Sequence, residues 1–423
     1  MRFPSYSSEW HSYTLGEILT FYSTNSFSRE KLNYDTGSVK NIHYGDIHTK
    51  FPSIVSVSDN KDIPFINNEI DLSKYSEDQY LQNGDLIIAD ASEDYEDIGK
   101  AIEVKNIDDE KVLAGLHTIL ARDNNNITVN GFKAYLFSTN SLKTKIKIIA
   151  NGISVLGISK NSLSKLTVNV PSKNEQNDVV DFISLIDNKI ELLEQKHQYY
   201  LDFKKFLMQQ IFTQKLRFDF DEIRLKSISK INKGKQLNKE HMLELGKFYV
   251  LNGGQEPSGY TDSWNTSENT ITISEGGNSC GFVNFNTEKF WSGGHCYYLN
   301  KLSENIDVYY LYSYLKFIEP QIMRLRVGSG LPNIQKGDIE NIKIKILPKK
   351  EQIKISNLLL STDNKISSIE SQKDSFEIFK KGLLQQMFVV RINWRCNFKL
   401  VKSPSFNKHL LILKNKIIFI IIK

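Results

Sequence analysis

The sequence predicts an α+β protein in which two similar mixed α/β domains are separated by two long antiparallel helices that pair as a coiled coil with pseudo-two-fold symmetry. Three observations predict this arrangement. A segment of 38 residues occurs twice without a gap, at 175–212 and at 351–388, with 14 identical positions. Each copy places apolar residues at the spacing of a helical heptad. Each copy also follows a long block of short strand-like runs.

The blocks at 1–170 and 217–347 are expected to form the two mixed α/β domains. Both blocks end alike, because 166–171 and 342–348 alternate apolar and polar residues and close with proline. Such alternation predicts a half-buried strand that leads into the helix. Short apolar runs bounded by Gly, Asn and Asp recur earlier in the blocks, as in the strands of a mixed α/β domain, at 85–89, 133–137 and 269–273.

The segments 171–216 and 348–390 are expected to form the two spacer helices. No other part of the chain has a matching seam, so the helices should pair with each other, and the long block between them allows an antiparallel pair. Polar residues such as Lys204 and Lys380 occupy seam positions, where buried polar groups specify register. The apolar seam positions are Ile183, Ile186, Ile190, Leu193 and Leu207 in the first helix, and Ile366, Ile369, Phe376 and Leu383 in the second.

The formal charge of +5 is concentrated in an atypical tail at 391–423, which is basic and apolar. This tail holds eight of the 54 Lys and Arg residues and no acid, which leaves 46 basic against 49 acidic groups elsewhere. Any nucleic-acid surface must therefore come from local clustering of charge. The apolar stretch at 410–422 is too short and too charged to span a membrane. Three cysteines without a CxxC pair favour a reducing, cytoplasmic location.

No catalytic or metal-binding motif stands out in the sequence. Phosphate loops, GxGxxG, HExxH and GxSxG are absent, and no Pro-Pro of an amino-methyltransferase loop occurs. Asp97, Glu103 and Lys105 resemble a nuclease acidic pair with a lysine, but such triplets are common by chance in a charged region. His117 and His295 occupy similar places in the two blocks and are more typical of structural histidines than of ligands. The sequence therefore favours a non-catalytic protein.

Two clusters of basic and amide residues occupy the same place in the repeat and are the candidates for DNA contact. Lys and Arg neutralise phosphates, while Arg suits guanine and Asn or Gln suits adenine. The ordinary alternative is a solvated helix end. The candidate residues are Lys143, Lys145, Lys147 and Asn151 in the first block, and Arg324, Arg326, Ser329, Asn333 and Gln335 in the second.

The chain resembles the specificity subunit of a type I restriction-modification system. The resemblance rests on a Pro-x-x-x-Glu-Gln … Asp-x-Lys-Ile … Lys-x-x-Leu-x-Gln-x-Phe pattern that occurs twice, after two α/β blocks, and covers about 10–390. It implies that 1–170 and 217–347 are target recognition domains, each reading one half of a split sequence in double-stranded DNA. It also implies docking of two methyltransferase subunits, with restriction subunits in the full complex. S-adenosylmethionine, ATP and Mg are then expected in those partners, with no cofactor in this chain and no membrane association.

Three alternatives stay open at this point. A non-catalytic coiled-coil adaptor would bind only protein and show no salt-dependent DNA affinity. A combined restriction-methylation enzyme would need nuclease and methylase domains in the same polypeptide. A silent or phase-variable copy of a specificity gene would explain the tail at 391–423, which departs from the family pattern.

Overall fold

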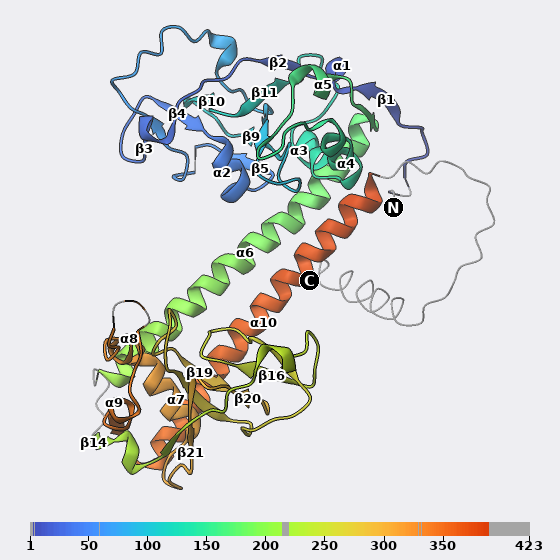
Figure 1. The fold of residues 1–423 in the computed structure, drawn as a ribbon. Coiled ribbons are helices and arrows are strands. Elements are labelled where there is room, and N and C mark those ends of the chain that lie inside the picture. Colours follow the sequence, from blue (N-terminus) through green and yellow to red (C-terminus); the bar gives the residue numbers. More distant parts are fainter. Residues whose placement is uncertain are drawn as a thin grey trace, which may run out of the picture. The chain divides into compact units, whose positions relative to one another are not determined.

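The computed structural model describes residues 3, 5–58, 60–213, 220–328, 330 and 332–388. The chain divides into two compact units, one made of 1–181 with 382–423 and the other of 182–381. Figure 1 shows a mixed α/β fold in each unit, joined to long helices. The expected fold class, two mixed α/β domains with two long helices that pack together, is confirmed. The predicted tail at 391–423 lies outside the described residues.

The first unit is built on a five-stranded sheet in the order β2-β11-β7-β9-β5. Two of its inner strands, β7 and β11, are buried along their whole length, as expected when both faces are covered. Their bounds are Thr20–Tyr22 for β2, Thr118–Arg122 for β11, Leu86–Ala89 for β7, Ala101–Lys105 for β9 and Ile54–Ser56 for β5. A second sheet has the order β10-β4-β6-β3, with β10 at Lys111–Ala114, β4 at Val39–Ile42, β6 at Phe65–Ile66 and β3 at Leu32–Asn33.

Short helices and two small ladders complete the first unit. The strand predicted before the first long helix is β13, Thr167–Val170, whose residues alternate exposed and buried and pair with β1, His11–Thr14. The other ladder joins β12, Leu156–Gly157, to β8, Ala91–Ser92. The helices are α1 at Leu15–Ile18, α2 at Tyr44–Thr49, α3 at Phe132–Phe137, α4 at Asn140–Ile149 and α5 at Lys160–Ser164. The run at 133–137 therefore lies in a helix, and its interpretation as a strand was wrong.

The second unit repeats this plan with a smaller sheet in the order β15-β21-β18-β19. Its strands are Lys230–Lys233 for β15, Cys296–Asn300 for β21, Thr270–Ser274 for β18 and Val283–Asn286 for β19. A three-stranded sheet joins β17, Gly259–Thr261, β16, Phe248–Leu251, and β20, Trp291–Ser292. A ladder joins β14, Asp221–Arg224, to β22, Lys343–Ile346, in the place of β1 and β13. The helices are α7 at Val308–Phe317, α8 at Glu319–Met323 and α9 at Lys336–Glu340.

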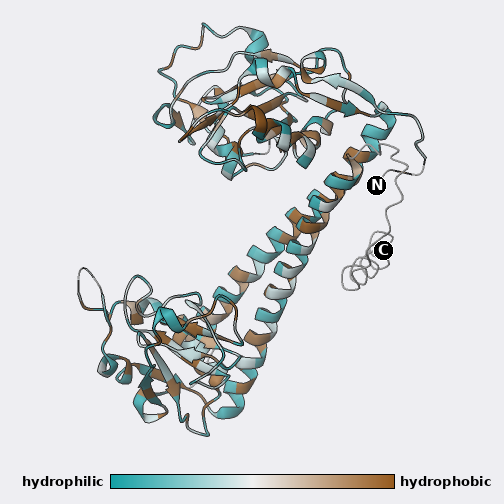
Figure 2. Ribbon diagram, turned by 45° about the vertical axis from the view of Figure 1, so that its right-hand side comes forward, coloured by the Kyte–Doolittle hydropathy of each residue, from teal (hydrophilic) through white to brown (hydrophobic). Residues whose placement is uncertain are grey.

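The two long helices are α6, Lys173–Phe212, and α10, Lys349–Met387, each about 60 Å long at 1.5 Å per residue. Ion pairs show that they run antiparallel inside the second unit, because partners on α10 descend in number as those on α6 ascend. The pairs are Asp187 with Lys380, Glu194 with Lys373 and Lys204 with Asp363. Figure 2 shows apolar residues recurring along both helices.

The positions named for the seam are buried or half-buried. Ile183, Ile186, Leu193, Ile369 and Leu383 are buried, whereas Ile190, Leu207, Ile366 and Phe376 are half-buried. Near the C-terminal end of α6, Leu207 packs against the core of the second domain, which also includes Ile355 and Leu359 of α10. Within the described residues, no helix has the length and apolar content to cross a membrane.

Candidate nucleic-acid interface

The second domain presents an exposed loop between α8 and α9 that carries its predicted DNA-contacting residues. Val327 and Asn333 close this loop by exchanging two backbone hydrogen bonds, of 2.8 and 3.0 Å. Arg324 and Arg326 lie just before the closure and are exposed, and in the described part of the chain neither guanidinium is paired with a carboxylate. Asn333 lies at the closure and Gln335, exposed, precedes α9. The structure therefore brings these four residues together, whereas Ser329 lies outside the described residues.

Glu275, which directly follows β18, anchors this loop through its backbone. The backbone oxygen of Glu275 accepts a 2.9 Å hydrogen bond from the Ile334 amide. Its side chain, which is only 5% exposed, receives the Lys233 ammonium at 2.5 Å and lies 3.4 Å from Nδ1 of His295. The hydroxyl of Tyr297 donates to it at 3.0 Å, and burial with this bond raises the pKa of Tyr297. The side chains of Lys233 and His295 around Glu275 are thus partly exposed, whereas the carboxylate that they contact is buried.

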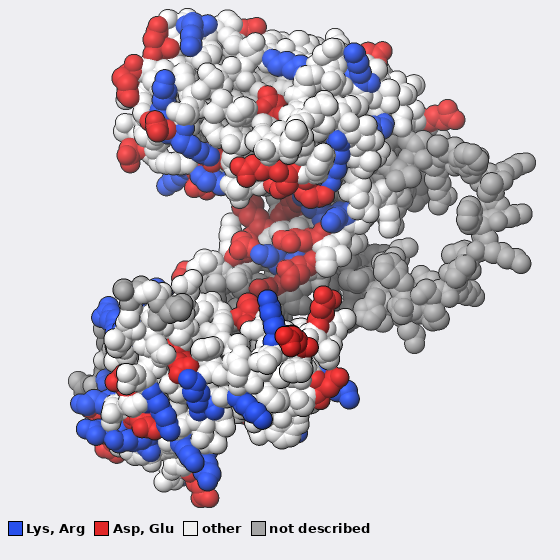
Figure 3. Space-filling view, in the orientation of Figure 1, with Lys and Arg blue, Asp and Glu red and all other residues white. Residues whose placement is uncertain are grey.

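Basic residues also gather at the far end of the second domain from its three-stranded sheet. Figure 3 shows Lys and Arg concentrated where α9 and β14 lie. Lys226, Lys230 and Lys301 line a cavity of about 450 Å³ there, together with Glu340. Outside its tail the chain carries more acidic than basic residues. This cluster therefore supplies the local positive charge that phosphate binding requires.

In the first domain the predicted lysines lie on α4, but the structure does not gather them on one free surface. Lys145 donates to the backbone oxygen of Thr167 at 2.6 Å. Lys147 forms an ion pair with Glu96. Lys143 is half-buried, and its pKa is lowered by burial and then by the nearby ammonium of Lys100. Alternate residues of a helix point to different sides, which separates Lys145 from the other two.

Asn151 closes a loop in the first domain in the way that Asn333 closes the loop in the second. Its backbone exchanges hydrogen bonds of 3.0 and 2.8 Å with Gly157. The loop between them exposes Ile153 and Val155, and Ile153 is fully exposed. Ile158 donates its amide to the backbone oxygen of Asp90 at 2.9 Å, as Ile334 does to Glu275. The two loops therefore share the same closing backbone pair and the same backbone anchor after a buried strand, but they carry different side chains.

An acid–histidine pair lies beside the closed loop in both domains, and sequence reasoning missed the two acids. Nδ1 of His117 lies 3.5 Å from Asp90, whose pKa is raised by burial against the opposing effect of His117. The equivalent pair in the second domain is His295 with Glu275. A signal was available, because Asp90 and Glu275 each follow a buried strand directly. Both histidine side chains are more than half exposed, so each can donate a hydrogen bond outward.

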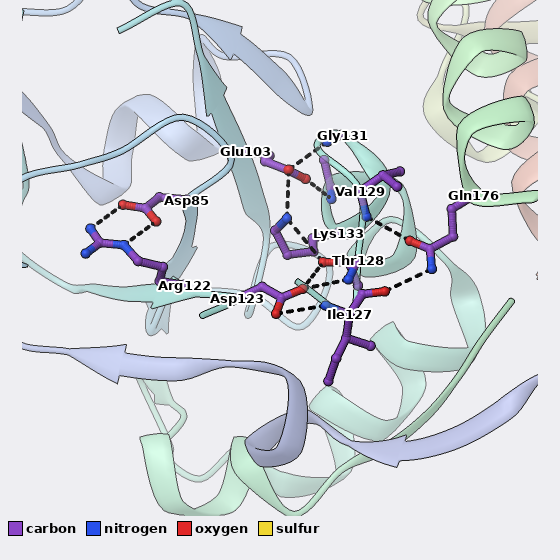
Figure 4. A network of polar contacts seen from close by, with 11 residues as sticks. Asp85, Glu103, Arg122, Asp123, Ile127, Thr128, Val129, Gly131, Lys133 and Gln176 are labelled. Carbon is purple, nitrogen blue, oxygen red and sulfur yellow. Dashed lines mark hydrogen bonds and ion pairs between the residues drawn. The ribbon is translucent and has the colours of Figure 1, made fainter. Parts of the chain in front are cut away.

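A buried polar network joins β9 to the start of α3 in the first domain (Figure 4). Glu103 accepts from the amides of Gly131 and Ala134 and lies 2.9 Å from the Lys133 ammonium. Burial raises the pKa of Glu103, and Lys133 opposes that effect. Lys133 continues the network to Thr128, at 3.4 Å. The carboxylate of Glu103, which resembles a nuclease acid in the sequence, thus belongs to a structural ion pair with Lys133.

The buried Gln of each Glu-Gln motif joins its long helix to the adjoining domain through three hydrogen bonds to the backbone. Gln176 accepts from the Val129 amide at 2.8 Å and donates to the backbone oxygens of Ile127 and Pro171, at 3.1 and 2.9 Å. The same three bonds occur at the second copy, where Gln352 accepts from Asp307 at 2.9 Å and donates to Asn305 and Leu347, at 3.1 and 2.7 Å. This repeated geometry explains why the motif occurs twice.

The family of this chain follows from its comparison with known proteins. Residues 7–199 and 218–377 each match the type I restriction modification DNA specificity domain. The chain belongs to the type I restriction-modification specificity subunits. It therefore has the function of a DNA specificity subunit, and this subunit is non-catalytic and carries no cofactor of its own. Among the described residues, no group of three His, Cys, Asp or Glu side chains could hold a metal ion.

Relatives and solved structures agree with this membership. The putative MjaX specificity subunit of Methanocaldococcus jannaschii is 25% identical over 356 residues, which span 76% of this chain and 80% of that protein. A putative specificity subunit of Mycoplasma genitalium is 34% identical over 147 residues, but the match spans only 38% of that protein and 34% of this chain. The crystal structure of an M. genitalium S subunit shares the fold with a TM-score of 0.63 at 17% identity, covering 92% of this chain and 98% of that one.

Proposed function

We propose that the two domains of this specificity subunit each read one half of a bipartite target in double-stranded DNA. The main support for the proposal is that the two loops are closed by the same backbone pairing but carry different side chains. In both domains a closed loop lies beside an acid–histidine pair, yet Arg324 and Arg326 lead into the loop of the second domain, whereas the first domain has Ile148 and Ala150 at the equivalent positions. Two readers with different side chains would recognise two different, non-palindromic half-sites.

The loop residues of the second domain are the best-supported contacts. The exposed guanidinium groups of Arg324 and Arg326 could pair with guanine edges or phosphates, and the amides of Asn333 and Gln335 suit adenine. In the first domain we assign Asn151 and the loop that follows it this role. The α4 lysines Lys143 and Lys147 would add to it only if their present contacts with the protein were exchanged for phosphates.

Membership of the family supports a proposal for the partners of the subunit. We propose that two methyltransferase subunits dock on it and modify adenine within the target, and that restriction subunits join the full complex. S-adenosylmethionine, ATP and Mg would be bound by those partners. The domain limits proposed above, 1–170 and 217–347, then mark the parts that carry sequence specificity, with 171–216 and 348–390 as the spacer helices.

A domain exchange followed by methylome sequencing tests the proposal. Replacing 1–170 with the corresponding block of another specificity subunit should change one half of the methylated motif and leave the other half unchanged. Replacing 217–347 should give the reciprocal result, and it serves as the matched control. If both halves changed together, the two-reader proposal would be wrong. If no motif were methylated by the intact complex, the chain would be a silent copy or a protein-binding adaptor.

A further inference from the structure

An acid and a histidine are joined in the same way in both domains, through their backbones as well as their side chains. The Asp90 amide donates a 3.1 Å hydrogen bond to the backbone oxygen of His117, and the Glu275 amide donates a 2.9 Å bond to that of His295. In each pair Nδ1 of the imidazole faces a carboxylate oxygen, at 3.5 Å in the first domain and 3.4 Å in the second. The two domains thus share this pair, whereas the loops beside it carry different side chains.

The two imidazoles contribute little to the packing of either domain. The side chains of His117 and His295 are 51 and 63% exposed. The backbone bond within each pair already joins the two segments without the imidazole. His117 also has a φ of 55°, in the left-handed region, where glycine would be free of strain. An exposed histidine that occurs in both domains at such a place is better explained by an external ligand than by packing.

In the second domain the acid has one oxygen that only the imidazole can satisfy. Lys233 of β15 lies 2.5 Å from Oε1 of Glu275, and the Tyr297 hydroxyl donates to the same oxygen. Oε2 is buried and has no hydrogen bond among the residues that the structure describes, but it lies 3.4 Å from Nδ1 of His295. A proton on Nδ1 would satisfy this oxygen and leave Nε2 for a ligand.

The first domain has the same set of groups, supplied by different residues. Burial raises the pKa of Asp90, and the charges of His117 and Lys160 oppose that effect. The Tyr44 ring packs against the imidazole of His117, with the ring centroids 5.3 Å apart. His43 adds no charge near neutral pH, because burial lowers its pKa to about 4. Each domain therefore places one carboxylate, one lysine and one exposed imidazole together.

The charges of these groups favour an anion as the ligand. The carboxylate and the lysine of each domain balance each other, so protonation of the imidazole leaves one positive charge. The ligand must also be common to both half-sites, because the pair is shared while the loops differ. Every half-site presents phosphates, whatever its bases. An imidazolium between a carboxylate and a phosphate donates one hydrogen bond to each.

We propose that His117 and His295 each hold a DNA phosphate as an imidazolium ion, so that the chain takes up protons when it binds DNA. The inference rests on the proposed function, because that function makes DNA the ligand. The two histidines set the overall affinity and orient the duplex on each domain, while the loops choose the bases. Affinity then rises as the pH falls through the range in which imidazole titrates, from about pH 8 to about pH 5.

Binding of the assembled complex to its target duplex and to an unrelated duplex of equal length tests the phosphate contact. His117→Asn and His295→Asn keep a polar side chain that tolerates a left-handed backbone but cannot titrate. Each should weaken binding to both duplexes by the same factor, about tenfold near pH 6 and less near pH 8. Near pH 6 the slope of log affinity against log salt should become shallower by about one. The methylated motif should stay that of the parent.

Two further histidines provide matched controls. His11→Asn in the first domain and His241→Asn in the second replace exposed imidazoles and should leave the affinity and its pH dependence unchanged. Calorimetry in buffers of different ionisation enthalpy counts the protons taken up on binding. Uptake should fall in His117→Asn and fall further when His295→Asn is added. Asp90→Asn removes the carboxylate but keeps the imidazole, so it should also reduce the uptake.

Three outcomes would overturn the inference while leaving the proposed function intact, since the parent complex would still methylate a bipartite motif. Relaxed base choice at one position of that motif in either histidine variant would show that the imidazole reads a base. An affinity loss that is independent of pH, with unchanged proton uptake, would exclude the imidazolium. An affinity equal to that of the controls would leave the pair a structural role only. A parent complex that methylates no bipartite motif would overturn the proposed function as well. Thermal unfolding of the histidine variants should stay close to that of the parent, because the replaced side chains are exposed.

Discussion

Lys204 of α6 lies 2.5 Å from Asp363 of α10, and the repeat-equivalent residues form the same pair with the helices exchanged, Asp187 with Lys380. Each lysine occupies a seam position, and each aspartate lies beside the seam of the opposite helix. The four side chains are between 20 and 28% exposed. A shift of one helix by a single residue would break both pairs, so they fix the antiparallel register.

Lys204→Glu should therefore lower the free energy of unfolding by about 1–2 kcal/mol, because it sets two carboxylates side by side. Adding Asp363→Lys should restore most of the loss. Urea unfolding of the two single variants and the double variant measures the coupling. Lys205→Glu, at an exposed neighbouring position, is the control and should change little. Additive losses in the double variant would show that the pair does not contribute to register.

Gln176→Met and Gln352→Met should each cost about 3 kcal/mol, because each variant leaves one backbone amide and two backbone oxygens, buried or part-buried, without their hydrogen-bond partner. Both side chains are essentially buried. Chemical denaturation measures the loss, and Gln198→Met on the exposed side of α6 should stay within about 0.5 kcal/mol of the parent. A loss no larger than that of Gln198→Met would refute this role of the two glutamines.

The first domain should lose stability as the pH falls from about 6.5 to about 4, because of His43. Nδ1 of His43 accepts a 3.2 Å hydrogen bond from the Gly45 amide at the start of α2. Burial, and then Arg29, lower the pKa of His43 from 6.5 to about 4. The folded state disfavours the protonated form, so the stabilisation is complete above pH 6.5, declines as the unfolded chain takes up the proton below that pH, and is gone near pH 4, where the folded chain is protonated as well.

We expect this group to account for about 2–3 kcal/mol over that range. His43→Asn keeps a side-chain acceptor at the helix start but cannot titrate there. Unfolding measured at several pH values for both chains isolates the histidine. If the free energy of unfolding changed with pH in the same way for the parent chain and for His43→Asn, the pH dependence could not be assigned to His43.

Arg324→Ala with Arg326→Ala should weaken binding of the assembled complex to its target duplex. If the guanidinium groups contact phosphates, the slope of log affinity against log salt should become shallower by about one for each lost contact. If one of them reads guanine, the methylated motif should relax at that position. Lys354→Ala, which removes an exposed charge paired with Glu351, is the control. An affinity, slope and motif equal to those of the control would assign both arginines to a solvated surface.

The sequence by itself determined the large-scale plan of the chain. Heptad spacing and a 38-residue repeat are local signals that survive without tertiary context, so they predicted α6 and α10 and the two similar domains around them. The strands β13 and β22 were also predictable, because alternation along a half-buried strand is recorded residue by residue.

Only the tertiary structure decided what depends on partners distant in sequence. The run at 133–137 is apolar throughout, and periodicity cannot distinguish a buried strand from a buried helix of that length. It forms α3 because Gly131, with φ of 89°, and Ala134 donate their amides to the carboxylate of Glu103, which lies on β9. A negative charge at a helix start stabilises that helix, and the sequence does not record that Glu103 is there.

The same reason governs the candidate DNA interface. Lys145 and Lys147 appear as one basic cluster in sequence, yet Thr167 and Glu96 engage them on different sides of α4. Arg324 and Asn333 are nine positions apart and come together because backbone pairing closes their loop. Charge and residue type can be read from a sequence, but whether an ammonium group faces water or a carbonyl oxygen is set by the packing of segments that only the folded chain brings together.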